Sequence, residues 1–326
     1  MLPLGVVIPT KNSMPYLPAH LEGLRPWLDL VEQIVVVDSF STDGSIEFLR
    51  TNLQHPRVTF TTHPPGLYAS WNHGIAQVSA KYTFIATTGD LITRAGIERL
   101  VGTAVALGCD VVISKPEFRD PAGRSLPDIA WPVDDVIAEL GLTSPRALHK
   151  LEALVFAAVH PEGALLGSCA SNVFRTDVLK RLPFPTEFGT AGDGAWAMQH
   201  AAEVAWAVVP EKFSSFLVHP SHASESERKT FREARRMDDV LRVAVKEWLA
   251  AGVVNEEELA RVRWSELSDA LRLFIDGKLA FDRHRRGGFP WSLNPAAWRV
   301  RAQRNRARRR MDELKRAVLR AVAATR

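Results

Sequence analysis

The chain has 326 residues, of which 46% are hydrophobic and 24% charged, with a formal net charge of +4 at pH 7, and this length suits one main domain with an appendage. Its two cysteines, Cys109 and Cys169, lie far apart in the sequence, which excludes a disulfide framework and favours a reducing compartment. No apolar run approaches the roughly 20 residues of a membrane span, and an apolar strand begins close to Met1, so we expect a cytoplasmic protein without a signal peptide.

The charged residues are distributed unevenly along the chain. Residues 283–326 carry 14 Lys and Arg against 2 Asp and Glu, a net charge of +12. The other 282 residues hold 27 basic and 35 acidic side chains, a net charge of −8. A mildly acidic body is therefore joined to a strongly basic carboxyl-terminal tail.

Short apolar runs in the first third of the chain predict strands, and the segments between them predict helices. The expected strands are residues 4–8, 33–37, 58–61, 83–87 and 110–114, and the expected helices are residues 15–28, 45–53, 67–79 and 95–106. Strands that alternate with helices indicate right-handed βαβ units, and thus an α/β protein with a mostly parallel sheet flanked by helices. Ligands of such sheets bind at the carboxyl edge of the strands.

The periodicity fades from residue 115 to about residue 146, which predicts an irregular, proline-rich insertion before a short helix over 147–159. Regular structure is expected again over 165–174, in helices that start at 176 and 193, and in strands at 204–209 and 213–218. A polar cluster at 219–227 should close a first domain of residues 1–225. Residues 226–326 then form a helical extension, with helices near 225–250, 255–283 and 295–324.

Polar loops follow the first two predicted strands. The first apolar run leads into Pro9-Thr10-Lys11-Asn12, and the second leads into Asp38, with Asp43-Gly44-Ser45 close behind. This pair of loops resembles the amino-terminal signature of the family-2 glycosyltransferases, which have the Rossmann-like GT-A fold. The resemblance implies that Pro9, Thr10, Asn12, Asp38 and Asp43 hold the base and ribose of a nucleoside-diphosphate sugar.

The two aspartates have chemistry that suits a nucleotide. A charged carboxylate at a strand end, such as that of Asp38, accepts strongly from an imino N–H like that of uracil. Asp43 is placed to accept from ribose hydroxyls. Asp and Ser are also preferred at helix starts, so capping alone is the alternative interpretation for Asp43.

A third segment, residues 66–76, contains an Asn-x-Gly at Asn72. The family resemblance implies that this segment forms a helix beside the diphosphate, with Asn72 donating to a phosphate or sugar hydroxyl. A helix with small residues packed against the sheet is the competing interpretation.

A fourth segment, which ends in Thr88-Gly89-Asp90, lies where the family usually carries an Asp-x-Asp that holds a divalent cation. This chain departs from that pattern and keeps one carboxylate, Asp90. The resemblance implies that Asp90 and His219 bind Mn²⁺ or Mg²⁺, with the donor's phosphates supplying further ligands, and that Thr88 and Gly89 line the donor site. The alternative for Asp90 is a turn residue after Gly89.

The acceptor side of the family ends in a Glu-Asp pair, and here the pair reads Gly192-Asp193. Inverting transfer needs a carboxylate beside the acceptor hydroxyl that takes its proton as the new bond forms. The resemblance implies that Asp193 is this general base and that Asn172 and Trp196 line the acceptor pocket. A carboxylate is also stabilised at a helix start, and Trp196 is equally suited to packing.

The basic tail reads as a cationic amphipathic helix whose apolar residues recur every three or four positions, as Met311, Leu314 and Val318 do. One interpretation is that it lies on an anionic membrane surface. The other is that it docks on its own catalytic domain or, in an oligomer, on a second copy. We expect no nucleic-acid partner, because the rest of the chain is acidic and shows no nucleic-acid motif.

Together these motifs predict an inverting, hexosyltransferase-type enzyme that moves a sugar from a nucleoside diphosphate to an acceptor hydroxyl. The expected acceptor is a glycan or a lipid-linked molecule of cell-envelope polysaccharide synthesis, and the expected location is the cytoplasm or the inner face of the membrane. The alternative is a non-catalytic, degenerate GT-A domain that binds a nucleotide and serves as a scaffold in a glycan-assembly complex. A nucleotidyltransferase is a weaker third interpretation, because Pro9-Thr10-Lys11-Asn12 is not a Gly-rich phosphate loop.

Overall fold

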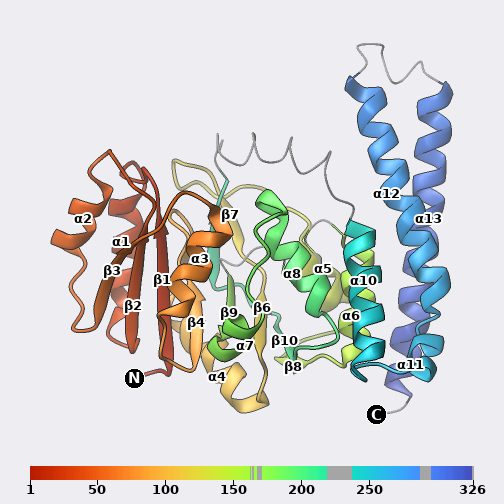
Figure 1. Ribbon diagram of the computed structural model, residues 1–326, viewed down its shortest axis with the longest axis horizontal. Coiled ribbons are helices and arrows are strands. Elements are labelled where there is room, and N and C mark those ends of the chain that lie inside the picture. Colours follow the sequence, from red (N-terminus) through yellow and green to blue (C-terminus); the bar gives the residue numbers. More distant parts are fainter. Residues whose placement is uncertain (162, 164, 167–170, 219–236, 287–294, 325–326) are drawn as a thin grey trace.

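The computed structural model describes residues 1–161, 163, 165–166, 171–218, 237–286 and 295–324. Within these ranges a large sheet of eight strands has the order β3-β2-β1-β4-β9-β6-β10-β8 (Figure 1). The strands are β1 (Leu4–Thr10), β2 (Gln33–Asp38), β3 (Val58–Thr62), β4 (Tyr82–Ile85), β6 (Val111–Ser114), β8 (Arg146–Ala147), β9 (Asn172–Arg175) and β10 (Trp206–Val209). β9 runs antiparallel to β4 and β6, and β8 runs antiparallel to β10, whereas the remaining pairs are parallel. The predicted α/β architecture with a mostly parallel sheet is confirmed.

A small sheet of three strands lies apart from the large one and joins segments distant in sequence. Its strands are β5 (Leu91–Ile92), β7 (Glu117–Arg119) and β11 (Ser214–Leu217). β11 pairs with β5 on one side and with β7 on the other, so the segment before residue 219 is held against the loop that follows β4.

Helices cover both faces of the large sheet (Figure 1). Those of the first 218 residues are α1 (Leu17–Leu28), α2 (Ser45–Asn52), α3 (Leu67–Ala76), α4 (Arg94–Leu107), α5 (Pro132–Leu140), α6 (Lys150–Val159), α7 (Thr176–Arg181) and α8 (Gly192–His200). Alternate residues of β1 serve the two faces: Val7 belongs to a cluster with α3, and Val6 and Ile8 belong to a second cluster with α1. Burial on both sides explains why the strands read as continuous apolar runs.

The insertion after residue 115 is more regular than the sequence predicts. α5 lies within it, and α6 begins at Lys150, three residues later than expected, because residues 146–147 form β8. Pro132 occupies the first turn of α5, where a proline is tolerated, and Asp134 accepts from the backbone N–H of Trp131 as a helix cap. The expectation of an irregular segment was therefore wrong for residues 132–140, where Pro132 starts a helix, whereas residues 120–131 form neither a helix nor a strand.

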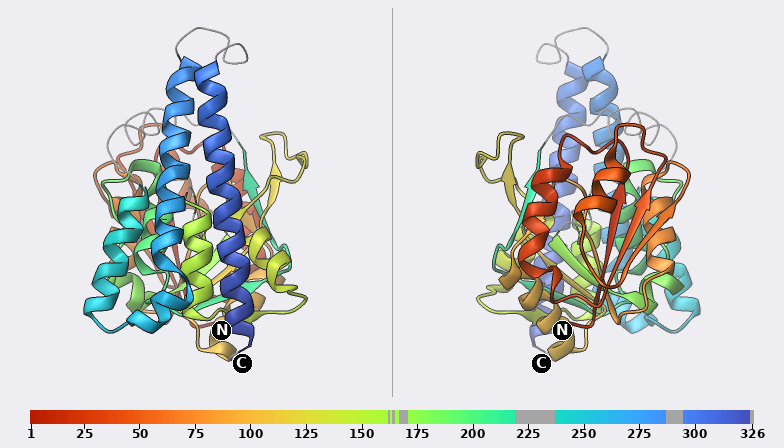
Figure 2. Two further views of the ribbon diagram at one scale, coloured as in Figure 1. Left: turned by 90° about the vertical axis from the view of Figure 1, so that its right-hand side faces the viewer. Right: turned by 90° about the vertical axis from the view of Figure 1, so that its left-hand side faces the viewer.

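The last third of the chain is helical, as predicted, and consists of α10 (Met237–Ala250), α11 (Glu256–Arg261), α12 (Trp264–Arg286) and α13 (Pro295–Ala323). Residues of α10, α12 and α13 share one hydrophobic cluster with residues of β1, β2 and α3. The long helices α12 and α13 pack side by side as a hairpin whose far end stands beyond the rest of the molecule (Figures 1 and 2). Among the described residues, no helix is long and apolar enough to cross a membrane.

Candidate functional site

The carboxyl ends of β1 and β2 bring the first two loops together. Thr10 and Asp38 are register partners at the strand ends, and the backbone N–H of Ser39 donates to the Thr10 carbonyl at 2.9 Å. Asp38 is buried, and its carboxylate accepts from the backbone N–H of Ser41 at 3.1 and 3.3 Å. The buried hydroxyl of Thr10 has no partner in the described part of the chain. A polar edge that carries an unsatisfied hydroxyl is suited to a polar ligand.

Asn12 and Asp43 fasten these loops to each other. The Asn12 side-chain oxygen accepts a hydrogen bond from the backbone N–H of Thr42 at 2.9 Å. Asn12 itself has a left-handed backbone conformation, with φ 46°. Asp43 accepts from the backbone N–H of Met14 at 2.9 Å and from that of Ser45 at 3.0 Å. Asp43 thus links the first loop to Ser45, the first residue of α2, although the N-cap position itself is occupied by Gly44. Asn12 and Asp43 together hold the two loops that are predicted to bind the nucleotide.

The loop after β4 places Asp90 against the small sheet. One carboxylate oxygen of Asp90 accepts from the backbone N–H of Leu217 at 2.8 Å. Burial raises the pKa of Asp90 to about 7, although that hydrogen bond acts in the opposite direction. His20 of α1 is fully buried next to this loop. Burial lowers the pKa of His20 to about 4, although hydrogen bonds with the backbone of Asp90 and Ala86 act in the opposite direction.

Thr88 and Gly89 fit tightly in the same loop. The Thr88 hydroxyl donates to the Pro9 carbonyl at 3.4 Å, which ties this loop to the end of β1. Gly89 has φ 101°, and a Cβ built there would lie 2.7 Å from the Leu217 side chain. An aspartate at position 89 would therefore have to take a backbone conformation that L residues rarely adopt, and would displace the end of the Leu217 side chain.

Asp193 lies in the first turn of α8, at the same edge of the sheet as Asp38 and Asp90. Its carboxylate accepts from the backbone N–H of Gly194 at 2.8 Å. Burial raises the pKa of Asp193 to about 6, against the lowering effect of a hydrogen bond from the Tyr68 side chain. Tyr68 belongs to the first turn of α3, which starts from the carboxyl end of β3, so topology accounts for the meeting of α3 and α8.

The departure at Gly192 has a packing cause. A Cβ at this position would lie 2.5 Å from two atoms of the Tyr68 ring and 2.6 Å from the Pro185 carbonyl oxygen. The Tyr68 ring thus fills the space that a longer residue at 192 would need. Sequence reasoning passed over Tyr68, although an aromatic hydroxyl four residues before Asn72 was a signal that could have been weighed.

Asn72, Trp196 and Asn172 serve internal packing. Both ends of the Asn72 amide bind the backbone of Phe184, at 2.8 and 3.0 Å, which joins α3 to the segment before α8. Trp196 is fully buried, and its indole N–H donates to the Leu182 carbonyl at 2.6 Å. Asn172 is fully buried at the start of β9. These contacts correspond to the packing interpretations of Asn72 and Trp196.

His219, the second predicted metal ligand, lies outside the described residues. Among the residues that the structure does describe, no three histidine, cysteine or acidic side chains are gathered as a metal site would require.

Comparison with known proteins identifies the first part of the chain. Residues 5–134 match the model of the family described as Glycosyl transferase family 2. This region belongs to glycosyl transferase family 2. No curated protein matches the sequence.

Several solved structures resemble this chain over nearly its whole length. S. aureus TarS 1–349 in complex with UDP-GlcNAc is 15% identical with a TM-score of 0.56, and the match covers 99% of this chain and 92% of that one. The same TarS fragment with UDP is 16% identical with a TM-score of 0.53 and the same coverage. The mannosyltransferase PcManGT from Pyrobaculum calidifontis, in complex with GDP-Man and Mn²⁺, is 16% identical with a TM-score of 0.49, over 99% of this chain and 86% of that one. The TarS matches show that the similarity in fold extends past residue 134 and continues through the carboxyl-terminal helical region.

Proposed function

We propose that this protein is an inverting glycosyltransferase that moves a sugar from a nucleoside-diphosphate sugar to an acceptor hydroxyl. The observation that carries the proposal is Asp193, a carboxylate with a pKa of about 6 at the sheet edge where Asp38 also lies. A general base works best when its pKa lies near the working pH, because it is then ionised and still accepts a proton readily. The family match and the nucleotide-bound TarS structures of the same fold support a sugar-nucleotide donor.

In this proposal Asp38 and the loops fastened by Asn12 and Asp43 bind the nucleoside, and Asp193 takes the proton of the acceptor hydroxyl. Asp90 would hold a divalent cation, Mn²⁺ or Mg²⁺, and the bound cation would keep this carboxyl ionised although burial raises its pKa to about 7 in the free protein. A bound cation would neutralise the charge that develops on the departing diphosphate. The acceptor in this proposal is a glycan or lipid-linked molecule of envelope polysaccharide synthesis.

Calorimetry with UDP, GDP and dTDP sugars, each with and without Mn²⁺, tests the donor. We expect one nucleotide class to bind, and Asp38→Asn to weaken that binding, because an amide lacks the charge that strengthens acceptance from an imino N–H. Asp29→Asn, an exposed carboxylate at the end of α1, is the matched control and should bind normally. Failure of all three classes to bind would contradict the proposal.

The second candidate function is a degenerate GT-A scaffold that binds a nucleotide without turnover. Its support is that Gly89 and Gly192 are built into the packing at positions where the family usually carries acidic residues. Donor binding without transfer to any glycan or lipid-linked acceptor, in a protein whose Asp193→Asn variant behaves identically, would favour the scaffold.

Tyr68→Phe tests the link between Tyr68 and Asp193. The hydroxyl of Tyr68 lowers the pKa of Asp193, so its removal should raise that pKa by about one unit and move the acidic limb of the pH–rate profile upward. Transfer should fall about fivefold near pH 6 and recover toward the wild-type rate above pH 8, with the affinity for the donor unchanged. An equal loss at every pH would mean that Tyr68 is structural only.

A further inference from the structure

The hairpin of α12 and α13 projects toward the side of the molecule on which the candidate site lies. The amino terminus, from which β1 starts, lies at the end opposite to the projecting end of the hairpin in Figures 1 and 2. The carboxyl ends of β1 and of the strands parallel to it therefore point in the direction in which the hairpin stands out. A flat surface in contact with the projecting end of the hairpin would therefore face the edge of the sheet at which the candidate site lies.

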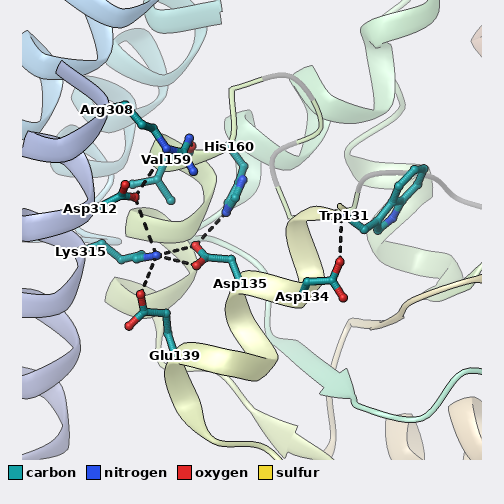
Figure 3. A network of polar contacts seen from close by, with 9 residues as sticks. All are labelled: Trp131, Asp134, Asp135, Glu139, Val159, His160, Arg308, Asp312 and Lys315. Atoms are coloured by element: carbon teal, nitrogen blue, oxygen red, sulfur yellow. Dashed lines mark hydrogen bonds and ion pairs between the residues drawn. The ribbon is translucent and has the colours of Figure 1, made fainter. Parts of the chain in front are cut away.

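The apolar face of α13 is not available to such a surface. Met311, Leu314 and Val318 are buried in the cluster shared with α6 and α12. Polar contacts fix the same stretch: Lys315 is 2% exposed and pairs with Asp135 at 2.6 Å and Glu139 at 3.0 Å (Figure 3). This part of the predicted amphipathic helix docks on its own chain and does not lie in a lipid interface.

Docking leaves one face of α13 exposed, and that face is basic. At the projecting end it carries what we call the tip patch, namely Trp298, Arg299, Arg301 and Arg306. Trp298 is 62% exposed, an unusual position for the largest aromatic side chain. Arg299 and Arg306 are exposed, and neither forms an ion pair with an acidic side chain in the described part of the chain.

We propose that the tip patch binds an anionic lipid bilayer end-on and holds the candidate site toward that bilayer. A bilayer surface offers both things that the patch presents, negative headgroups for the arginines and an interfacial layer in which a tryptophan ring is stabilised. A polyanion without an apolar layer would account for the arginines but not for Trp298 beside them. The inference deepens the proposed function and rests on it in one respect, because a lipid-linked acceptor would then be presented to the site.

End-on contact makes a prediction that distinguishes the tip from the rest of the helix. Arg316 and Arg320 are also exposed on α13, but they lie about 27 Å or more from Trp298 along the helix axis. This separation exceeds three Debye lengths at physiological ionic strength, where one is about 8 Å. If the hairpin meets the bilayer with its end, Arg299 should therefore contribute most to binding and Arg306, about 12 Å from Trp298 along the axis, should contribute less. Arg316 and Arg320 should contribute nothing measurable.

Sedimentation with phosphatidylglycerol vesicles tests the proposal on the full-length protein. One arginine near an anionic surface contributes about fivefold to binding, so Arg299→Glu with Arg306→Glu should lower the partition coefficient about 30-fold or more. The matched control, Arg316→Glu with Arg320→Glu, changes the net charge of the same helix equally and should keep wild-type binding. Neutral phosphatidylcholine vesicles should not bind either protein.

Brominated lipids provide a second readout at the tryptophan itself. Bromine in the interfacial part of the acyl chains should quench part of the protein's fluorescence, and Trp298→Phe should reduce this quenching by the contribution of that one ring. Vesicle binding needs neither donor nor turnover, so it is tested separately from the glycosyltransferase proposal.

Three outcomes would overturn the inference. The first is that the wild-type protein ignores anionic vesicles at low salt. The second is that the control pair loses binding as strongly as the tip pair, which would mean general attraction along the helix. The third is preferential binding of an oligonucleotide over vesicles, which would assign the patch to nucleic acid.

Discussion

Replacing Asp193 with asparagine should lower the rate of sugar transfer about 10²–10⁴-fold and leave donor affinity unchanged. The amide preserves the size of the side chain but takes no proton, so only the step at the acceptor hydroxyl is lost. In the wild-type protein the same carboxylate must be ionised, and transfer should fall as the pH drops below about 6. Steady-state rates, and calorimetry with whichever nucleotide sugar binds in the donor screen, give the two measurements.

The same variant should be more stable than the wild type at neutral pH. The pKa of Asp193 is raised from 3.8 to about 6 in the folded protein, so the folded state binds the proton more tightly than the unfolded state. The carboxyl group therefore destabilises the fold progressively as the pH rises from about 4 through 6. Asp193→Asn removes this effect, which is on the order of 2 kcal/mol at pH 7 after allowance for partial exposure.

Thermal unfolding at several pH values measures this gain, which should shrink as the pH is lowered from 7 toward 4. The matched control is Asp177→Asn, which replaces an exposed carboxylate in the first turn of α7. This substitution should change the stability at pH 7 by no more than about 0.5 kcal/mol and should leave the rate of sugar transfer unchanged. Near-normal transfer by Asp193→Asn would remove Asp193 from the role of base. Loss of transfer together with loss of stability would indicate a structural role instead.

The sequence was most informative where local pattern and burial agree. The runs that end at Thr10 and Asp38 are apolar because both faces of β1 and β2 are covered, and their polar ends meet because parallel strands place their carboxyl ends together. The helix starts predicted at residues 45 and 193 were also nearly correct, because α2 begins at Ser45 and α8 at Gly192. Such features depend on neighbours in the chain or on one simple rule of sheet geometry.

The features that escaped prediction depend on partners distant in sequence. The Asn72 amide binds Phe184, and Tyr68 meets Asp193 and excludes any side chain at Gly192, across more than 100 residues in each case. Strands β5 and β7 are two and three residues long, so neither has enough length to show a period. The apolar face of α13 was recognised, but a lipid interface and a protein surface require the same pattern.

Replacing Lys315 with methionine should destabilise the protein by about 3–5 kcal/mol at pH 7. Lys315 is buried between α13 and α5, and its ammonium is within 3.0 Å of the carboxylates of both Asp135 and Glu139 (Figure 3). Methionine retains most of the length of the side chain but lacks the ammonium, which lies 5.9 Å from the centre of the Phe156 ring, so the loss mainly reports the missing positive charge and not a large cavity. Denaturant unfolding followed by circular dichroism measures the free energy of unfolding.

The sign of the pH dependence follows from Asp135. Although burial alone would raise its pKa, the hydrogen bonds from His160 and Lys315 lower the pKa of Asp135 to about 2. The interaction therefore stabilises the fold above about pH 4, and this contribution is lost as the pH falls through 2. Without Lys315 the pKa of Asp135 should rise, and this carboxyl should then become protonated at a higher pH. The difference in the free energy of unfolding between Lys315→Met and the wild type should therefore already become smaller between pH 5 and pH 4.

Two further variants separate the buried ion pair from general effects of charge on α13. Arg316→Met alters the neighbouring exposed residue and should change stability by no more than about 0.5 kcal/mol. The triple variant Lys315→Met, Asp135→Asn, Glu139→Gln should recover part of the loss, because no buried charge is left without a partner. Equal destabilisation by Lys315→Met and Arg316→Met would show that the network in Figure 3 does not hold the hairpin against the body.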